Sequence, residues 1–176
     1  SYFFLAAALC RGKVKVMNIN PFSLQGDIRL LAVMEDLGCN VSRGEDWVEV
    51  KGGELRPGDY IIDMGDMPDM VPTLAVLSAF REGKTQITNV AHLRLKESDR
   101  IAALVSEISR IGVAAEETAD GLIIRGGKPQ GAKIETYNDH RIAMSFAIAG
   151  LAVPGMSLTN WQCVNKSFPA FWEEME

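Results

Sequence analysis

One stretch in the middle of the chain shows helical periodicity with a single apolar face. Its apolar side chains recur at intervals of three and four residues, at Ile101, Leu104, Val105, Ile108 and Ile111. This spacing predicts an amphipathic helix. Ser98 is the expected N-cap, which would place Asp99 and Arg100 in the first turn. Gly112 is the expected end of the helix.

Three Ala-rich apolar stretches predict further helices, at Tyr2–Cys10, Val71–Phe80 and Ile142–Leu151. Each is followed by a predicted strand that begins at a turn glycine, and these segments resemble one another: Arg11–Asn18, Glu82–Asn89 and, more weakly, Pro154–Asn160. Their glycines, Gly12, Gly83 and Gly155, lie 71 and then 72 residues apart. This regular spacing predicts a structural repeat whose units pack around a common core or axis.

The expected unit runs strand, helix, strand, strand, strand, helix. After a helix at 27–37, strands are expected at Cys39–Val41, Trp47–Val50 and Tyr60–Asp63. After the helix at 99–111, the corresponding strands are Val113–Ala115, Leu122–Arg125 and Lys133–Thr136. A short helix is expected at Phe168–Met175. The alternation predicts an α/β fold, and because no internal boundary is visible, residues 1–176 are expected to form a single lobe.

Composition narrows the classes of function. With 176 residues, 47% of them hydrophobic, the chain can bury a core. Its net charge of −5 argues against a nucleic-acid partner, and no apolar run is long enough to span a membrane. The three cysteines are widely separated, which predicts buried thiols in a reducing compartment, and two histidines are too few to predict a metal site. Because the chain begins without methionine and its first residues read as the middle of a helix, we expect it to be part of a longer protein.

The residues His92–Arg100, with the sequence HLRLKESDR, carry the strongest chemical signal. Cations at a helix N-terminus oppose the helix dipole, unless an anion binds there. Glu97, between Lys96 and Arg100, is a carboxylate in a cationic setting and therefore a candidate acid or base. The alternative interpretation is a solvated first turn with ordinary surface ion pairs.

Polar residues also mark other predicted helix starts, namely Pro68-Asp69, Asn138-Asp139-His140-Arg141 and Asn165-Lys166-Ser167. Repeated units could bring these starts to one side of the molecule. That surface would carry four cations, Lys96, Arg100, Arg141 and Lys166, which we expect to repel one another until an anion or a second lobe neutralises them. The alternative is that Asp69 and Asp139 are simple caps and that His140 is a satisfied helix-start histidine.

Four motifs together resemble the C-terminal half of the 5-enolpyruvylshikimate-3-phosphate synthase (EPSP synthase) family. They are MPDMVPTLAV at 67–76, KESDR at 96–100, NDHRIAM at 138–144 and NKSFPAFW at 165–172. The resemblance implies a fold of two similar lobes, each with three βαβαββ units around a helical core. It further implies that this chain is most of one lobe, and that the N-terminal lobe and a short completing segment are missing.

The same resemblance implies an activity. The family transfers the carboxyvinyl group of phosphoenolpyruvate to the 5-hydroxyl of shikimate 3-phosphate and releases phosphate, by addition and elimination without metal or cofactor. By resemblance, Glu97 is the proton-transfer carboxylate near the methylene carbon and Asp69 holds the attacking hydroxyl. Lys166 is the third catalytic residue and binds phosphoenolpyruvate. The fragment alone is expected to be inactive.

The remaining site residues are implied by the same motifs. Arg100 and Arg141 would bind phosphoenolpyruvate, Lys96 would contact shikimate 3-phosphate, and His140 would support the pocket. His92, which stands where some members carry asparagine, would contact substrate from the same segment. Glyphosate occupies the phosphoenolpyruvate site in this family. The location implied is cytoplasmic, or organellar if the source is a plant.

Two other functions stay open at this point. The nearer one is the enolpyruvyl transferase that acts on UDP-N-acetylglucosamine, which shares the fold and the donor. The presence of KESDR followed by NDHR favours the shikimate enzyme. The other is a non-catalytic anion-binding module built on the same helix starts, and substitution of Glu97 would separate it from an enzyme.

Overall fold

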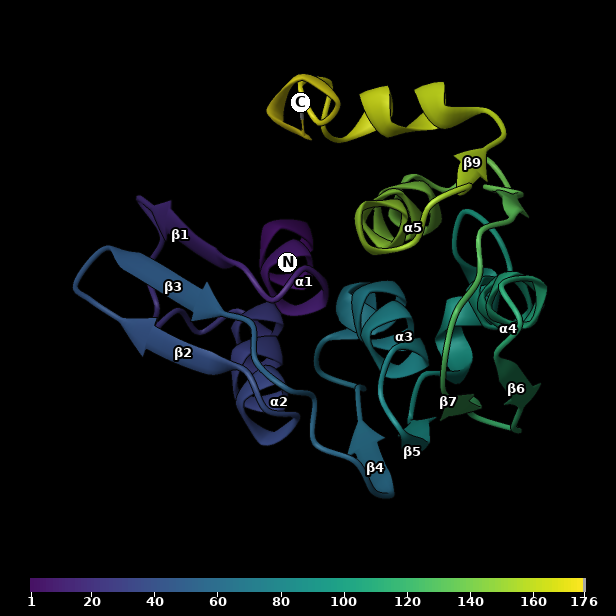
Figure 1. The fold of residues 1–176 in the computed structure, drawn as a ribbon, viewed down its shortest axis with the longest axis horizontal. Coiled ribbons are helices and arrows are strands. Elements are labelled where there is room, and N and C mark those ends of the chain that lie inside the picture. The colour runs from purple at the N-terminus through teal and green to yellow at the C-terminus, as the bar shows by residue number, and fades with distance from the viewer. Residues whose placement is uncertain (176) are drawn as a thin grey trace.

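In the computed structural model, which describes residues 1–175, three small β-sheets surround a core of helices (Figure 1). The central helices are α1 (Tyr2–Leu9), α3 (Val71–Ala79) and α5 (His140–Ala152), and each contacts the other two. Every residue of α3 is buried, as expected for a helix that is apolar on all sides. The core therefore lies along these three helices, with the sheets outside it.

The first sheet is antiparallel and has the order β1-β3-β2, from β1 (Lys13–Met17), β2 (Asn40–Arg43) and β3 (Trp47–Lys51). The second has the order β4-β5-β7-β6, from β4 (Tyr60–Asp63), β5 (Gly83–Thr88), β6 (Ala114–Glu117) and β7 (Leu122–Gly126). The third pairs β8 (Lys133–Ile134) with β9 (Ser157–Leu158). The pairs β4–β5 and β8–β9 are parallel.

Two further α-helices and several 3₁₀ helices complete the chain. Helix α2 (Leu30–Asp36) precedes β2 and α4 (Arg100–Arg110) precedes β6. The 3₁₀ helices are η1 (Gly26–Arg29), η2 (Pro68–Met70), η3 (Ala91–Leu95), η4 (Trp161–Lys166) and η5 (Glu173–Met175). Helix α4 buries one face against β6, β7 and α3, as its apolar spacing predicts.

The predicted repeat is confirmed by topology and by backbone conformation. Sheet order β1-β3-β2 in one unit corresponds to β5-β7-β6 in the next, and β4–β5 corresponds to β8–β9. An asparagine follows β1, β5 and β9, and all three have positive φ, at Asn18 (57°), Asn89 (62°) and Asn160 (42°). Asparagine tolerates this left-handed conformation better than most residues. The mixed α/β fold that the pattern predicts is therefore the observed one.

Two local predictions are wrong. Of the helix expected at Phe168–Met175, only Glu173–Met175 is helical, as η5, and Lys166 ends a 3₁₀ helix instead of preceding one. The aromatic rings of this segment pack against one another and against Tyr2, with Phe171 fully buried, so tertiary packing overrides a weak local preference. Cys39 is buried, but Cys10 is exposed because it lies just beyond the end of α1.

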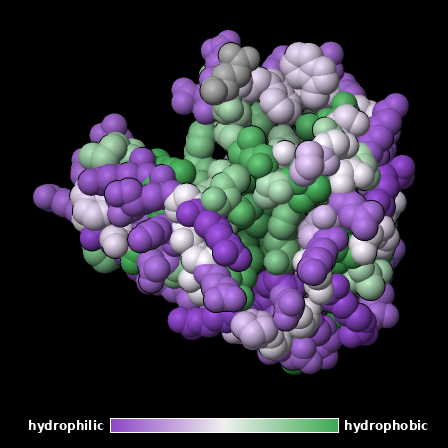
Figure 2. Space-filling model, viewed as in Figure 1, coloured by the Kyte–Doolittle hydropathy of each residue, from purple (hydrophilic) through white to green (hydrophobic). Residues whose placement is uncertain are grey.

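The surface in the same view is not uniformly polar. Figure 2 shows hydrophobic residues in the hollow over the central helices and hydrophilic residues along its rim. Among residues 1–175, no helix combines the length and the apolar character that crossing a bilayer requires.

Candidate active site

The site is built at the start of α4. Asp99, not Ser98, is the N-cap, because the Asp99 carboxylate accepts a hydrogen bond from the backbone N–H of Ala102 at 3.0 Å. The Ser98 hydroxyl instead donates to Asp139 Oδ2 at 3.1 Å. The expected cap is therefore wrong by one residue, and the reason is a partner 41 residues away that local sequence does not show.

Arg100 is the centre of the site and is buried, with 1% of its side chain exposed. Its guanidinium donates to three carboxylates. Nε lies 2.7 Å from Asp139 Oδ2, Nη1 3.1 Å from Asp69 Oδ1, and Nη2 2.7 Å from Glu97 Oε2. Burial acts to lower the pKa of Arg100, but these carboxylates together raise it, so the group stays charged. One side chain thus joins three separate segments of the chain.

Arg141 completes the pairing of Asp69. Its Nη2 donates to Asp69 Oδ2 at 2.7 Å, so the two Asp69 oxygens are each held by one arginine. The backbone N–H of Arg141 donates to Asp139 Oδ1 at 2.9 Å, which makes Asp139 the N-cap of α5. Asp139 is fully buried, so it is both a cap and the innermost charge of the site.

Glu97 faces two further groups. Lys166 Nζ lies 3.4 Å from Glu97 Oε1, and His140 Nδ1 lies 4.0 Å from the same oxygen without a hydrogen-bond partner within the described residues. A hydrogen bond from its own backbone N–H, then Arg100 and Lys166, hold the pKa of Glu97 below its usual range. Burial, followed by the nearby charge of Arg141, lowers the pKa of His140, so this imidazole is neutral at neutral pH.

These contacts overturn one expectation about charge. Three carboxylates, Asp69, Glu97 and Asp139, face three cations, Arg100, Arg141 and Lys166. The predicted mutual repulsion of the cations is therefore wrong for these three, because each has a carboxylate within 3.4 Å. The idea that an anion or a second lobe is needed to neutralise this surface is wrong for the same reason.

The structure brings six of the eight predicted site residues together: Asp69, Glu97, Arg100, His140, Arg141 and Lys166. Lys96 and His92 are exposed on the segment that leads into α4, and no hydrogen bond joins their side chains to the cluster within residues 1–175. Sequence reasoning missed Asp139 as a member and treated it only as a cap. The available signal was its position directly before two predicted site residues in Asn-Asp-His-Arg.

The exposed atoms of the cluster determine what it can do. Glu97 is 27% exposed and Lys166 is 61% exposed, whereas Arg100 and Asp139 are sealed beneath them. A ligand can thus reach ionised carboxylates and cations on one surface, which suits anion binding together with proton transfer. No group of histidine, cysteine and acidic residues in the described part of the chain is arranged to hold a metal ion.

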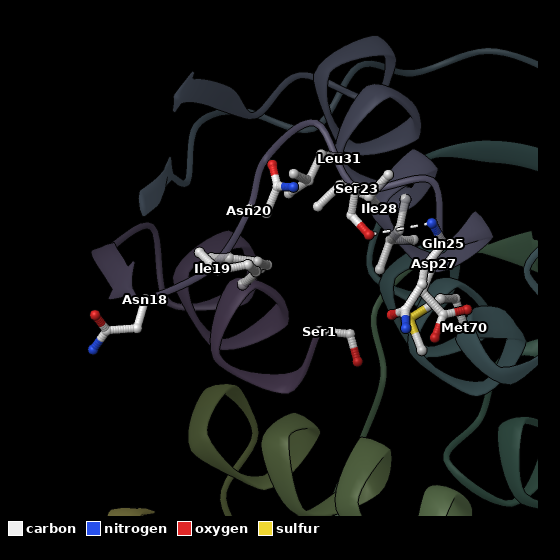
Figure 3. A pocket seen from close by; sticks show the side chains of 12 residues that line it. Ser1, Asn18, Ile19, Asn20, Ser23, Gln25, Asp27, Ile28, Leu31 and Met70 are labelled. Atoms are coloured by element: carbon white, nitrogen blue, oxygen red, sulfur yellow. Dashed lines mark hydrogen bonds between the residues drawn. The ribbon is translucent and has the colours of Figure 1, made fainter. Parts of the chain in front are cut away.

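A pocket of about 390 Å³ lies between the start of α1 and the loop after β1, and none of the clustered site residues lines it (Figure 3). Its polar lining comes from Ser1, Asn18, Asn20, Ser23, Gln25 and Asp27, and no arginine or lysine is among the lining residues. In the repeat, Asp27 corresponds to Asp99, and Ile28 stands where Arg100 stands. The first unit differs from the site in backbone as well, because Asp27 lies within the 3₁₀ helix η1, whereas Asp99 caps α4 directly.

Comparisons with known proteins agree with one another. The sequence model of "EPSP synthase (3-phosphoshikimate 1-carboxyvinyltransferase)" matches residues 1–175. A 3-phosphoshikimate 1-carboxyvinyltransferase of Syntrophobacter fumaroxidans is 52% identical over 179 aligned residues, which cover 100% of this chain and 42% of the relative. The corresponding protein of Thermococcus kodakarensis is 45% identical, with 98% of this chain and 43% of the relative covered.

A solved structure supports the same relationship. An EPSP synthase from Acinetobacter baumannii superposes with a TM-score of 0.82 and 30% sequence identity, covering 98% of this chain and 43% of that chain. The chain thus spans about two fifths of the length of the proteins it matches and corresponds to one lobe of their fold. Agreement of the sequence model, the relatives and the fold over nearly every residue means that this chain belongs to the EPSP synthase (3-phosphoshikimate 1-carboxyvinyltransferase) family.

Proposed function

We propose that residues 1–176 form a single lobe of an enzyme that transfers the carboxyvinyl group of phosphoenolpyruvate to the 5-hydroxyl of shikimate 3-phosphate. Family membership supports the reaction, and the relatives are named 3-phosphoshikimate 1-carboxyvinyltransferase. The observation that carries the proposal is the paired placement of Glu97 and Asp69 around Arg100, with Arg141 and Lys166 beside them. The rest of the site, in this proposal, belongs to an N-terminal lobe that this chain does not contain.

Two carboxylates would handle the protons. In the addition step the hydroxyl oxygen bonds to C2 of phosphoenolpyruvate, while a proton is added to the methylene carbon. In the elimination step that carbon loses a proton and phosphate leaves. In addition, Asp69 would hold the attacking hydroxyl and take its proton, while Glu97, once it has taken up a proton from solvent, would give that proton to the methylene carbon. In elimination, Glu97 would remove a proton from the same carbon as phosphate leaves. The lowered pKa of Glu97 keeps it ionised at rest, which fits removal of the proton in elimination.

The cations would bind the anionic donor. Arg141 and Lys166 would contact phosphoenolpyruvate directly, and this role is supported by their partly exposed side chains, at 23% and 61%. Arg100 is buried, so it would act on the donor mainly by holding Asp69 and Glu97, and a direct contact would require one of these carboxylates to move. His140 would support the pocket. Lys96 and, earlier in the same exposed segment before α4, His92 would face shikimate 3-phosphate.

Phosphate release from phosphoenolpyruvate tests this proposal directly. The chain is mixed with a separately made N-terminal lobe of the same protein, and shikimate 3-phosphate and UDP-N-acetylglucosamine are offered in parallel. Release only with shikimate 3-phosphate is the expected result. Release only with the nucleotide sugar would assign the other transferase. No phosphate release with either acceptor, although scattering shows that the lobes associate, would favour a non-catalytic anion-binding module.

A substitution at Glu97 separates catalysis from binding. Glu97→Gln should lower kcat by roughly 10²–10⁴-fold, the range for loss of a general acid–base group, and change KM for phosphoenolpyruvate much less. Glu116→Gln is the matched control, because Glu116 forms an exposed ion pair with Arg125 on the β6–β7 hairpin. Equal kcat for Glu97→Gln and the control would contradict the assigned role.

A further inference from the structure

Helix α5 is preceded by a tight turn whose backbone is unusual for its residues. The backbone N–H of Asp139 donates to the carbonyl of Thr136 at 2.8 Å, which closes a turn with Tyr137 and Asn138 at its centre. Both central residues have positive φ, 53° and 55°. Turns of this kind normally use Asn-Gly or Asp-Gly, and a bulky residue at positive φ is strained. Tyr137 therefore needs an anchor that keeps it in this conformation.

A carboxylate from α4 supplies that anchor. Glu107 is fully buried, about two helical turns beyond Arg100. The Tyr137 hydroxyl donates a hydrogen bond to Glu107 Oε1 at 2.8 Å, and the backbone N–H of Glu135 donates one to Oε2 at 3.0 Å. Arg110 Nε, 3.0 Å from Oε2, balances the charge. Burial, the largest influence, raises the pKa of Tyr137, so the phenol remains a donor.

The neighbouring asparagine has a separate and weaker support. Asn160 Nδ2 donates to Asn138 Oδ1 at 3.0 Å. Asparagine tolerates positive φ, so this residue contributes less strain than Tyr137. The bond between the Tyr137 phenol and Glu107 is therefore the specific feature that holds the strained residue.

This turn determines where α5 begins, and the first residues of α5 belong to the site. Asp139 is its cap and Arg141 reaches Asp69. Helix α4 thus holds the start of α5 at two points, through Arg100 on Asp139 and through Glu107 on Tyr137. A shift of the turn would move the Arg141 guanidinium relative to Asp69, and small displacements of binding groups are costly in catalysis.

We propose that Glu107 is a positioning residue: its buried carboxylate holds the Thr136–Asp139 turn in its left-handed conformation and thereby orients Arg141 toward the anionic substrate. Glu107 does not reach the site surface itself, because its side chain is fully buried. The catalytic readout of this inference rests on the proposed function, whereas the backbone readout does not.

The test uses the full-length protein that contains this chain, with two substitutions that loosen the anchor. Glu107→Gln removes the negative charge and sets an amide NH₂ group opposite groups that themselves donate hydrogen bonds to Glu107. Tyr137→Phe removes only the hydroxyl. Both should raise KM for phosphoenolpyruvate by about tenfold, with Glu107→Gln the larger. Glu116→Gln, which removes an exposed carboxylate, should leave KM unchanged. Equal KM values in all four proteins, including the unaltered one, would overturn the inference.

A rescue distinguishes positioning from simple stabilisation. Glycine adopts positive φ without strain, so the double variant Glu107→Gln with Tyr137→Gly no longer needs the anchor. Its KM should return toward the unaltered value, although loss of the tyrosine ring lowers the melting temperature further. If KM instead rises in step with the loss of stability, Glu107 is merely structural and the inference fails.

Hydrogen exchange gives a readout that does not depend on activity. The amide of Asp139, which closes the turn, should exchange at least tenfold faster in Glu107→Gln and recover in the double variant, while amides of α3 stay unchanged. If the unaltered protein shows no turnover, the proposed function fails, but this measurement still tests the positioning role. Unchanged exchange at Asp139 in Glu107→Gln would overturn it.

Discussion

At the scale of single residues, the chemistry of this chain depends on where one charge is buried. Arg100 lies beneath the surface with three carboxylate partners, one of which, Asp139, is also fully buried. A buried charge is tolerated only when its partners satisfy it, so the cluster acts as a unit. The exposed members, Glu97 and Lys166, can then contact a ligand while the buried ion pair of Arg100 and Asp139 holds the cluster in place.

The first prediction concerns the stability of this cluster. Arg100→Leu should lower the free energy of unfolding by about 3–5 kcal/mol, because it leaves Asp139 buried without its cation. Urea denaturation measures the change. Arg125→Leu is the control, since it breaks an exposed ion pair that is worth about 0–1 kcal/mol. Similar losses in the two variants would show that Arg100 is not a buried hub.

The second prediction concerns pH. The pKa of His140 is lowered in the folded protein from an ordinary value of 6.5, chiefly by burial. His140 therefore takes up its proton at a higher pH in the unfolded chain than in the folded protein. As pH falls below 6.5, proton uptake by the unfolded chain lowers the free energy of unfolding, and this loss ends below the lowered pKa of the folded protein. His140→Gln should flatten this part of the stability curve in urea titrations.

At the scale of elements, the helices that carry the site begin in the same way. Helices α4 and α5 each have an aspartate N-cap whose carboxylate accepts a backbone N–H, at Asp99 and Asp139. An arginine follows close behind each cap and turns toward a carboxylate from another element. The caps satisfy the free N–H groups, so the unfavourable position of a cation near the helix start is offset.

The third prediction tests the cap of α4. Asp99→Ala should lower the free energy of unfolding by about 1 kcal/mol, the usual cost of losing an N-cap. Asp99→Asn keeps an acceptor for the Ala102 N–H and should lose less than half as much, although it also loses the ion pair with Arg94. If Asn were as damaging as Ala, the ion pair and not the cap would account for the effect.

At the scale of the whole molecule, the repeat brings distant segments together. The bonds of the cluster join residues separated by 31, 39, 69 and 72 positions in the chain. The repeat also needs close packing between each central helix and its sheet. A Cβ at Gly52 would lie 2.1 Å from the Ala7 carbonyl of α1, and one at Gly126 would lie 2.0 Å from the Arg81 carbonyl just after α3.

The fourth prediction tests this packing. Gly126→Ala should lower the free energy of unfolding by about 1–3 kcal/mol, because a Cβ there meets backbone atoms that cannot move without separating α3 from its sheet. Gly127→Ala is the matched control, since nothing lies within 4 Å of a Cβ at that position. Thermal unfolding measures both variants, and an equal fall in melting temperature would contradict the role of close packing at Gly126.

The sequence by itself determined the elements and the repeat. Apolar periodicity located α4, and Ala-rich apolar stretches located the three central helices. The spacing of Gly12, Gly83 and Gly155 predicted the repeated units, because these signals are local and recur. It also identified six residues that the structure brings together. It placed Lys96 in the same cationic group as Arg100, since local charge does not show which side chain is buried.

Only the tertiary structure decided the pairing of charges. Arg100 and Arg141 meet carboxylates from other units, so the cations attract partners instead of repelling one another. Asp139 and Glu107 were missed as site-forming residues because their partners lie 28 or more positions away. Charges and hydrogen bonds act through space, and packing of repeated units brings side chains that are distant in the sequence as close as those of a neighbouring helical turn.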